Sequence, residues 1–248
     1  MTAPSGYRLV AYEEIDSTNT EAARLAASGV EDGTIVWART QRAGRGRRGR
    51  AWVSPPGNLY CSILLRPDCR AREALQLGFV AALAAAEAIG RAAGGAGVSL
   101  KWPNDVLLNG RKIAGCLLES QASAGERLAW LVIGLGINVV SFPADVEFPA
   151  TSLAAEGAVA LAVEAIRDSY LAAFARRRWQ WRHEGFAPVR AAWLGMAVGL
   201  GKDIRVRLER ETLAGRFSAL DADGGLVLAL SDGSERVVTA GDIFSIAA

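Results

Sequence analysis

Residues 100–120 read LKWPNDVLLNGRKIAGCLLES, and this stretch has the pattern of two strands joined by a tight turn. The apolar run Val106–Leu108 and the longer run from Arg111 to Glu119 flank the pair Asn109-Gly110. An Asn-Gly pair between apolar runs favours a two-residue hairpin turn, because both of its residues must adopt positive φ. The stretch therefore predicts a β-hairpin.

A further strand is expected before the hairpin, over Val98–Trp102, and Pro103 should end its pairing because proline has no backbone N–H. The predicted register brings Asp105 and Lys112 close together on adjoining strands. Only three of the 28 basic residues are lysines, and two of them, Lys101 and Lys112, fall in this stretch. Because lysine is a compact point charge and arginine a planar fork, this choice suggests a specific role for the amines. An ordinary hairpin with an Asp–Lys ion pair would give the same pattern.

The composition limits the class of protein. A chain of 248 residues can bury a full core and form one large and one small domain. The net charge of +2 gives no global reason to expect a nucleic-acid or membrane partner. Cys61, Cys69 and Cys116 form no CxxC pair, which argues against a disulfide scaffold or a zinc ribbon and favours a reducing cytoplasm.

Several catalytic classes lack their residues. His183 is the only histidine, so Ser-His-Asp triads and HExxH zinc sites are not supported, and we expect His183 at the surface. Residues 1–16 contain no apolar core of a signal peptide. The most apolar window, Leu77–Ala86, is too short to span a bilayer and predicts a buried helix.

The remaining pattern predicts an α+β fold with a small β-rich domain at its C-terminal end. Thr18 followed by Glu21 suggests a capping box that opens a helix ending near Ser28. Further strands are expected at Arg8–Ile15, Thr34–Thr40, Leu59–Arg66 and Leu128–Val140, and helices at Arg72–Ala93, Val159–Arg182 and Phe186–Leu194. After a boundary at 196/197, short strands at Ile204–Leu208, Leu213–Ala219, Leu226–Leu230 and Arg236–Thr239 suggest a small β-barrel.

Residues 41–50 read QRAGRGRRGR. After Gln41 and Arg42 they contain four arginines, Arg45, Arg47, Arg48 and Arg50, and three glycines. The glycines formally match the dinucleotide motif GxGxxG, but that motif must open a helix, and Pro55-Pro56-Gly57 follow shortly. The stretch instead predicts a flexible loop, the arginine loop (residues 41–50), that folds onto an anion through guanidinium and backbone N–H groups. A solvated face or a nucleic-acid contact is the alternative.

Two other features suggest a ligand. Ser17, Thr18 and Asn19 stand at a strand-to-helix junction, where they can cap the helix, bind a polar head group, or do both. Gly134 and Gly136 interrupt an apolar strand, which suggests close approach by a ligand or another chain, with a bulge or tight packing as the alternative. Cationic donors without a protein nucleophile favour phosphate chemistry, and no Walker A motif is present.

The ordered motifs DSTN (16–19), residues 41–50, KWPNDVLLNGRKIAG (101–115) and IGLGIN (133–138) make the chain resemble biotin protein ligases from about residue 8 to residue 246. The resemblance implies a class II aminoacyl-tRNA synthetase-like catalytic domain, with a mixed sheet and helices, in residues 1–196, and an SH3-like barrel in 197–248. It implies that biotin and Mg-ATP form biotinyl-5′-AMP, from which biotin passes to a lysine of a biotin carboxyl carrier domain.

The resemblance also implies roles for individual residues. Lys112 and Arg47 would be catalytic, with Mg²⁺ entering on the ATP phosphates and Asp105 as a candidate metal ligand. No prosthetic group is expected. The biotin site would comprise Ser17, Thr18, Asn19, Gln41, Arg45, Gly46, Arg47, Lys112, Gly115 and Gly134. The ATP and adenylate site would comprise Arg47, Arg50, Trp52, Lys101, Asn104, Asp105 and Asn138.

Two alternatives remain open. A lipoate or octanoate ligase shares the fold, although its acyl tail needs an apolar slot in place of the polar Ser-Thr-Asn end. A nucleic-acid-binding module would use the arginine loop on phosphates. We further expect no operator binding, because the chain starts at the first catalytic strand, and a homodimer by analogy with the family.

Overall fold

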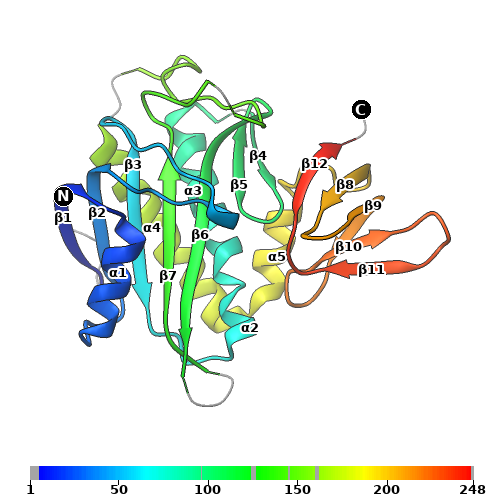
Figure 1. Ribbon diagram of the computed structural model, residues 1–248, viewed down its shortest axis with the longest axis horizontal. Coiled ribbons are helices and arrows are strands. Elements are labelled where there is room, and N and C mark those ends of the chain that lie inside the picture. Colours follow the sequence, from blue (N-terminus) through cyan, green and yellow to red (C-terminus); the bar gives the residue numbers. More distant parts are fainter. Residues whose placement is uncertain (1–5, 96, 124–126, 145, 160–161, 247–248) are drawn as a thin grey trace.

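The computed structural model describes residues 6–95, 97–123, 127–144, 146–159 and 162–246. Its centre is a seven-stranded mixed sheet in the order β1-β2-β3-β7-β6-β5-β4 (Figure 1). Only the β1–β2 pair is parallel, and every other neighbouring pair in this sheet is antiparallel. The strands are β1 Arg8–Ile15, β2 Thr34–Gln41, β3 Leu59–Leu65, β4 Val98–Lys101, β5 Asp105–Leu108, β6 Arg111–Ala122 and β7 Leu128–Ile137.

Helices cover both faces of this sheet. Helix α1 (Thr18–Ala27) packs on β2, β3 and β7 from one side, and α3 (Leu77–Ala92) with α4 (Val163–Glu184) covers the other side (Figure 1). The main core lies beneath α3 and α4, where alanine-rich α3 allows close packing, and a smaller apolar cluster lies beneath α1. The segment Ala71–Ala92 is long and apolar enough to cross a membrane by composition, but 72% of its most apolar window is buried in this core.

A second, five-stranded antiparallel sheet follows α5 (Phe186–Leu194) in the order β11-β10-β9-β8-β12. It packs beside the far end of the main sheet (Figure 1). Trp102 Nε1 donates to the Gly224 carbonyl at 3.2 Å, and Phe79 stacks edge-on with Trp193 at a centroid distance of 5.4 Å. The two sheets therefore share one continuous apolar core. The strands are β8 Asp203–Arg207, β9 Thr212–Leu220, β10 Leu226–Ala229, β11 Glu235–Val238 and β12 Asp242–Ile246.

The hairpin prediction is confirmed. Asn109 and Gly110 adopt φ of 50° and 74°, and β5 pairs with β6 across them. The α+β class and the rejection of a dinucleotide motif are also confirmed, since the loop continues into only a single 3₁₀ turn, Arg47–Gly49.

Two local predictions are wrong. Ser17 is the N-cap residue of α1, so Glu21 stands too far along the helix for a capping box and instead accepts a hydrogen bond from Tyr12 Oη at 2.9 Å. The helix expected over Arg72–Ala93 is two helices, α2 (Ala71–Ala74) and α3, because Leu75 and Gln76 form a turn between them.

Candidate active site

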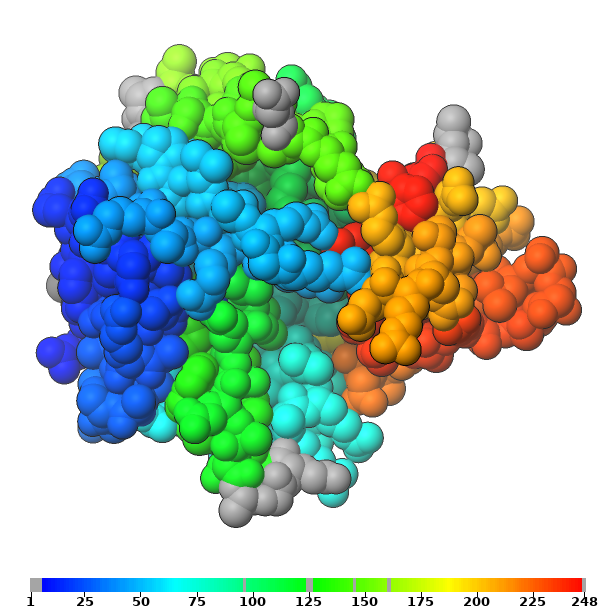
Figure 2. Space-filling view, viewed as in Figure 1, coloured from blue at the N-terminus to red at the C-terminus, as the bar shows by residue number. Residues whose placement is uncertain are grey.

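One cavity of about 360 Å³ opens on the α1 side of the main sheet. Its walls come from the start of α1, the arginine loop, the β5–β6 hairpin, β7 and the segment after β7, and residue 242 of the second sheet closes it. The light-blue segment that contains the arginine loop crosses this face of the molecule toward the C-terminal sheet (Figure 2). The cavity thus lies where the two sheets meet.

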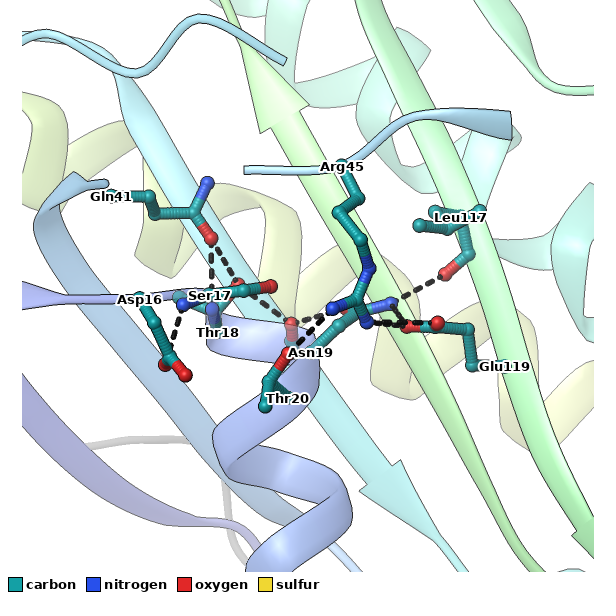
Figure 3. A network of polar contacts seen from close by, with 10 residues as sticks. Asp16, Ser17, Thr18, Asn19, Thr20, Gln41, Arg45, Leu117 and Glu119 are labelled. Carbon is teal, nitrogen blue, oxygen red and sulfur yellow. Dashed lines mark hydrogen bonds and ion pairs between the residues drawn. The ribbon is translucent and has the colours of Figure 1, made fainter. Parts of the chain in front are cut away.

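Neutral polar groups form the wall at the start of α1 (Figure 3). The side-chain oxygen of Gln41, Oε1, accepts hydrogen bonds from the Thr18 backbone N–H at 2.8 Å and from Thr18 Oγ1 at 3.1 Å. Gln41 Nε2 donates to Ser54 Oγ at 2.9 Å, so both ends of the amide are fixed. Ser17 is buried at the N-cap of α1, and its side chain makes no capping hydrogen bond. These groups can recognise an uncharged polar ligand.

The arginine loop folds back on itself at the cavity mouth. The Gly46 N–H donates to the Arg50 carbonyl at 2.7 Å, and the Trp52 N–H donates to the Gly44 carbonyl at 2.9 Å. A Cβ atom on Gly44 would stand 2.4 Å from the Trp52 carbonyl oxygen, so this position requires glycine. The glycines therefore allow the loop to turn tightly and to place its arginines over the cavity.

Asp242, at the start of β12, gathers three of those arginines. Its Oδ1 lies 3.1 Å from Arg47 Nη1, and its Oδ2 lies 3.7 Å from Arg48 Nη1 and also pairs with Arg50. Burial lowers the pKa of the Arg47 guanidinium, and the Asp242 carboxylate opposes that shift. The Asp242 carboxylate thus holds the loop in this structure.

The lysine of the hairpin faces the same space. Lys112 Nζ pairs with Asp105 Oδ1 at 2.6 Å, which confirms the predicted proximity of the two side chains. The amine also lies 5.7 Å from the centre of the Trp52 ring. A Cβ atom on Gly115 would stand 3.5 Å from Lys112 Nζ, so the amine lies directly beside this glycine of β6.

Lys101 lies at the edge of this group and is outside the cavity lining. Its Nζ stands 3.5 Å from the centre of the Phe148 ring, and Phe148 does line the cavity. Burial lowers the pKa of Lys101, with Asp105 acting in the opposite direction. Lys101 therefore lies behind the part of the cavity wall that Phe148 forms.

The paired glycines of β7 have a clear packing reason. A Cβ atom on Gly134 would stand 2.1 Å from Asn19 Oδ1, and one on Gly136 would stand 2.4 Å from the Trp52 ring. Tight packing by the Asn19 and Trp52 side chains, the alternative to a ligand or another chain, therefore accounts for these two glycines. Both of those side chains line the cavity, so the glycines shape its floor.

The cavity brings together every predicted site residue except Lys101. The lining includes Ser17, Thr18, Asn19, Gln41, Arg45, Gly46, Arg47, Arg50, Trp52, Asn104, Asp105, Lys112, Gly115, Gly134 and Asn138. The arginine loop and Lys112 share this one space, as the proposed anion chemistry requires. Cations gather around Asp105 and Asp242, and neutral groups gather at α1, which suits an elongated ligand with a polar head and an anionic end.

Sequence reasoning missed several residues of the site. Asp242 comes from the C-terminal sheet, and Val146, Glu147 and Phe148 come from the segment between β7 and α4. Their contacts join parts of the chain far apart in sequence, and no local motif marks them. The two prolines at positions 143 and 149 were the one available signal of an ordered loop.

Comparisons with known proteins agree with this geometry. The chain is 44% identical over 235 residues to the biotin–[acetyl-CoA-carboxylase] ligase of Paracoccus denitrificans, covering 92% of this chain and 97% of the relative. It is 34% identical over 244 residues to the bifunctional ligase/repressor BirA of Bacillus subtilis, covering 96% of this chain and 74% of the relative.

A solved biotin protein ligase from Aquifex aeolicus, in complex with biotin and ATP, superposes with a TM-score of 0.82 at 28% identity, covering 97% of this chain and 98% of that one. A family model for the biotin/lipoate A/B protein ligases matches residues 11–138, and a model for the biotin protein ligase C terminal domain matches residues 199–245. The chain therefore belongs to the biotin/lipoate A/B protein ligase family, and its C-terminal sheet is the C-terminal domain of a biotin protein ligase.

Proposed function

We propose that the protein is a biotin–[acetyl-CoA-carboxylase] ligase that uses ATP to attach biotin to a carrier protein. In the first step a biotin carboxylate oxygen bonds to the α-phosphorus of ATP, and the bond from that phosphorus to pyrophosphate breaks. In the second step a carrier lysine amine bonds to the acyl carbon of biotinyl-5′-AMP, and AMP leaves. The single observation that carries the proposal is the shared cavity of Lys112, the arginine loop and the polar start of α1.

The charge pattern supports these steps. Biotin's carboxylate and the α-phosphate repel each other, so their approach needs cations directed at both anions. Lys112 and Arg47 line the cavity and would hold the two groups together. Preorganised donors of this kind stabilise a transition state by about 3–4 kcal/mol each. No protein nucleophile is needed, because the carboxylate itself attacks.

The neutral wall would bind the other end of biotin, whose ureido ring carries both N–H donors and a carbonyl acceptor. Ser17, Thr18, Asn19 and Gln41 present hydroxyl and amide groups there, with Gly115 and Gly134 in the walls. Arg45 and Gly46 would border biotin from the loop. Trp52, Arg50, Asn104 and Asn138, with Lys101 behind Phe148, would surround ATP and the adenylate.

Magnesium would arrive on the ATP phosphates. Among the described residues, no group of three or more His, Cys, Asp or Glu side chains could hold a metal ion. Asp105 lines the cavity and is the candidate ligand from the protein, once Lys112 turns from it toward the substrate anions.

The proposal extends to the partner, the domains and the compartment. The carrier would be the biotin carboxyl carrier domain of a carboxylase. The catalytic domain would be residues 1–196 and the SH3-like domain 197–248. The three cysteines are free, which is typical of a cytoplasmic protein. A homodimer and the absence of operator binding stay predictions, which light scattering and a gel shift test respectively.

The decisive experiment incubates the protein with biotin, ATP and Mg²⁺ and measures biotinyl-5′-AMP and pyrophosphate release. We expect Lys112→Ala and Arg47→Ala each to lower kcat by about a hundredfold or more, as for other preorganised donors. Lys202→Ala is the matched control, because Lys202 is the third lysine and is exposed in the C-terminal domain. Wild-type turnover in both site variants would refute the assigned roles. Competition between biotin and lipoate in the same assay would reveal a lipoate ligase.

A further inference from the structure

Glu119 is a charged residue beside the cavity to which the proposed reaction gives no part. It lies on β6 two residues after Leu117, so both side chains are on the cavity face of the sheet. Its carboxylate accepts from Arg45 Nη2 at 2.9 and 3.0 Å and from Asn19 Nδ2 at 2.6 Å (Figure 3). One acid therefore joins the helix α1, the arginine loop and the sheet.

The first consequence concerns the orientation of the Asn19 amide. An ionised carboxylate and a backbone carbonyl can only accept hydrogen bonds. Asn19 Nδ2 faces two such acceptors, the Glu119 carboxylate and the Leu117 carbonyl, the latter at 3.4 Å. A rotated amide would set its oxygen against both, so Glu119 fixes the amide with its NH₂ group toward β6.

The opposite end of the amide then presents an oxygen. Asn19 Oδ1 accepts from Ser62 Oγ at 2.6 Å and lies against Gly134, which is part of the cavity wall. A carbonyl oxygen has two lone pairs, so one acceptor position of Asn19 remains for a ligand N–H. A cyclic urea supplies N–H donors of this kind, whereas an acyl tail does not.

The second consequence concerns the side chain of Arg45. Arg45 Nη1 donates to Thr20 Oγ1 at 2.7 Å while its Nη2 binds Glu119. Arg45 is thereby directed toward α1 and β6, and Arg47 and Arg50 are directed toward Asp242. The arginines of the loop thus pair with two acids, Glu119 near the start of α1 and Asp242 at the start of β12.

We infer that Glu119 is a positioning residue for biotin recognition, which holds the Asn19 oxygen and the Arg45 side chain in place at the ureido end of the cavity. This inference rests on the proposed function. It predicts that a change at Glu119 acts on biotin affinity and leaves the ATP end and the chemical step unaffected.

Glu119→Gln tests this with little change in shape. Both oxygens of Glu119 accept hydrogen bonds in the wild-type protein. In the glutamine variant an NH₂ group replaces one of them and must face a donor, Asn19 or Arg45, so one hydrogen bond is lost. We expect the KM and the calorimetric Kd for biotin to rise about tenfold, as one lost hydrogen bond to a charged group would produce. The KM for ATP and kcat should stay close to the wild-type values. Glu211→Gln is the matched control, since Glu211 makes a similar exposed ion pair with Arg236 in the C-terminal sheet.

An exchange of amide and acid provides the second test. Asn19→Asp alone sets two carboxylates against each other and should weaken biotin binding strongly. Adding Glu119→Gln restores a hydrogen bond between an amide and an acid at these two positions. Residue 19 still presents an acceptor oxygen at Gly134, so the double variant should bind biotin more tightly than Asn19→Asp alone.

The outcomes separate the two hypotheses. If the wild-type protein forms no biotinyl-5′-AMP, the proposed function fails. If the wild-type protein is active, and Glu119→Gln keeps the wild-type KM for biotin, raises the KM for ATP equally, or gives no rescue of Asn19→Asp, then only the role of Glu119 is overturned.

Discussion

A single methyl group on Gly134 would stand 2.1 Å from Asn19 Oδ1, closer than side-chain atoms approach one another. Gly134→Ala should therefore push Asn19 out of position and raise the KM for biotin about tenfold or more, since a displaced polar group loses its hydrogen bonds. Pyrophosphate-release kinetics measure the effect. Gly90→Ala is the control, because its Cβ would meet only Val98 at 3.8 Å within helix α3. An unchanged KM for biotin in Gly134→Ala would contradict the assignment of this wall to biotin.

Glu156 gives a prediction about pH. Thr151 Oγ1 donates to Oε1 of Glu156 at 2.6 Å and Asn109 Nδ2 donates to Oε2 at 2.8 Å, and these bonds lower the pKa of Glu156 from its usual 4.5. Because the folded pKa is the lower one, this carboxylate stabilises the fold above pH 4.5 and loses its effect as the pH falls through the folded pKa.

The matching variant is Glu156→Gln, measured by urea unfolding between about pH 3 and pH 6, the range that spans carboxyl titration. The wild-type protein should exceed the variant in unfolding free energy at the upper end, and the difference should shrink toward the lower end. Glu13→Gln provides an exposed control, with 87% of its side chain accessible. A difference that grew on acidification would show that the hydrogen bonds to Glu156 do not stabilise its charged form.

At the scale of elements, the arginine loop depends on β12. Asp242 neutralises part of the charge of Arg47, Arg48 and Arg50, and these like charges repel one another without it. Asp242→Asn should therefore open the loop in the unliganded protein, and limited digestion with trypsin should cut it faster after these arginines. Biotin with ATP should restore protection, because the ligand anions supply the missing charge. Mass spectrometry identifies the cleavage sites, and Glu211→Gln is the control. Equal cleavage rates in the wild-type protein and Asp242→Asn would show that Asp242 does not hold the loop closed.

The same scale shows what the sequence could predict. The hairpin at Asn109-Gly110 was predictable because a local backbone preference fixes it, and its register then placed Lys112 beside Asp105. The capping box failed because the strand-to-helix connection is one residue tighter than the Thr18–Glu21 spacing assumes, with Ser17 already the N-cap. Asp242 and Glu119 could not be predicted, since their partners lie 195 and 74 residues away and no periodicity encodes such contacts.

At the scale of the whole molecule, the C-terminal sheet completes the site. Arg207 Nη2 of β8 pairs with Glu147 Oε1 at 2.7 Å, next to Phe148 in the cavity wall, and Asp242 holds the arginine loop. The two segments that border the anionic end of the cavity are thus both tied to the second sheet. Activity should therefore require that sheet even though most site residues lie on the first one.

The shared core predicts that both sheets unfold together, and Gly224 tests it. Gly224 has a φ of +92°, and a Cβ there would stand 2.5 Å from the Phe79 ring, across the contact between the C-terminal sheet and helix α3. Gly233 has a similar φ of +84° with nothing within 4 Å of its Cβ, so Gly233→Ala reports backbone strain alone, about 1–2 kcal/mol. Gly224→Ala should lower Tm further, by several degrees more than the control.

On heating, the variant should lose ligase activity in the same single step in which calorimetry records unfolding, because separating the sheets removes Asp242 and Arg207 from the cavity. Two resolved transitions, or activity that survives the first of them, would mean that the sheets fold independently and that the cavity does not need both.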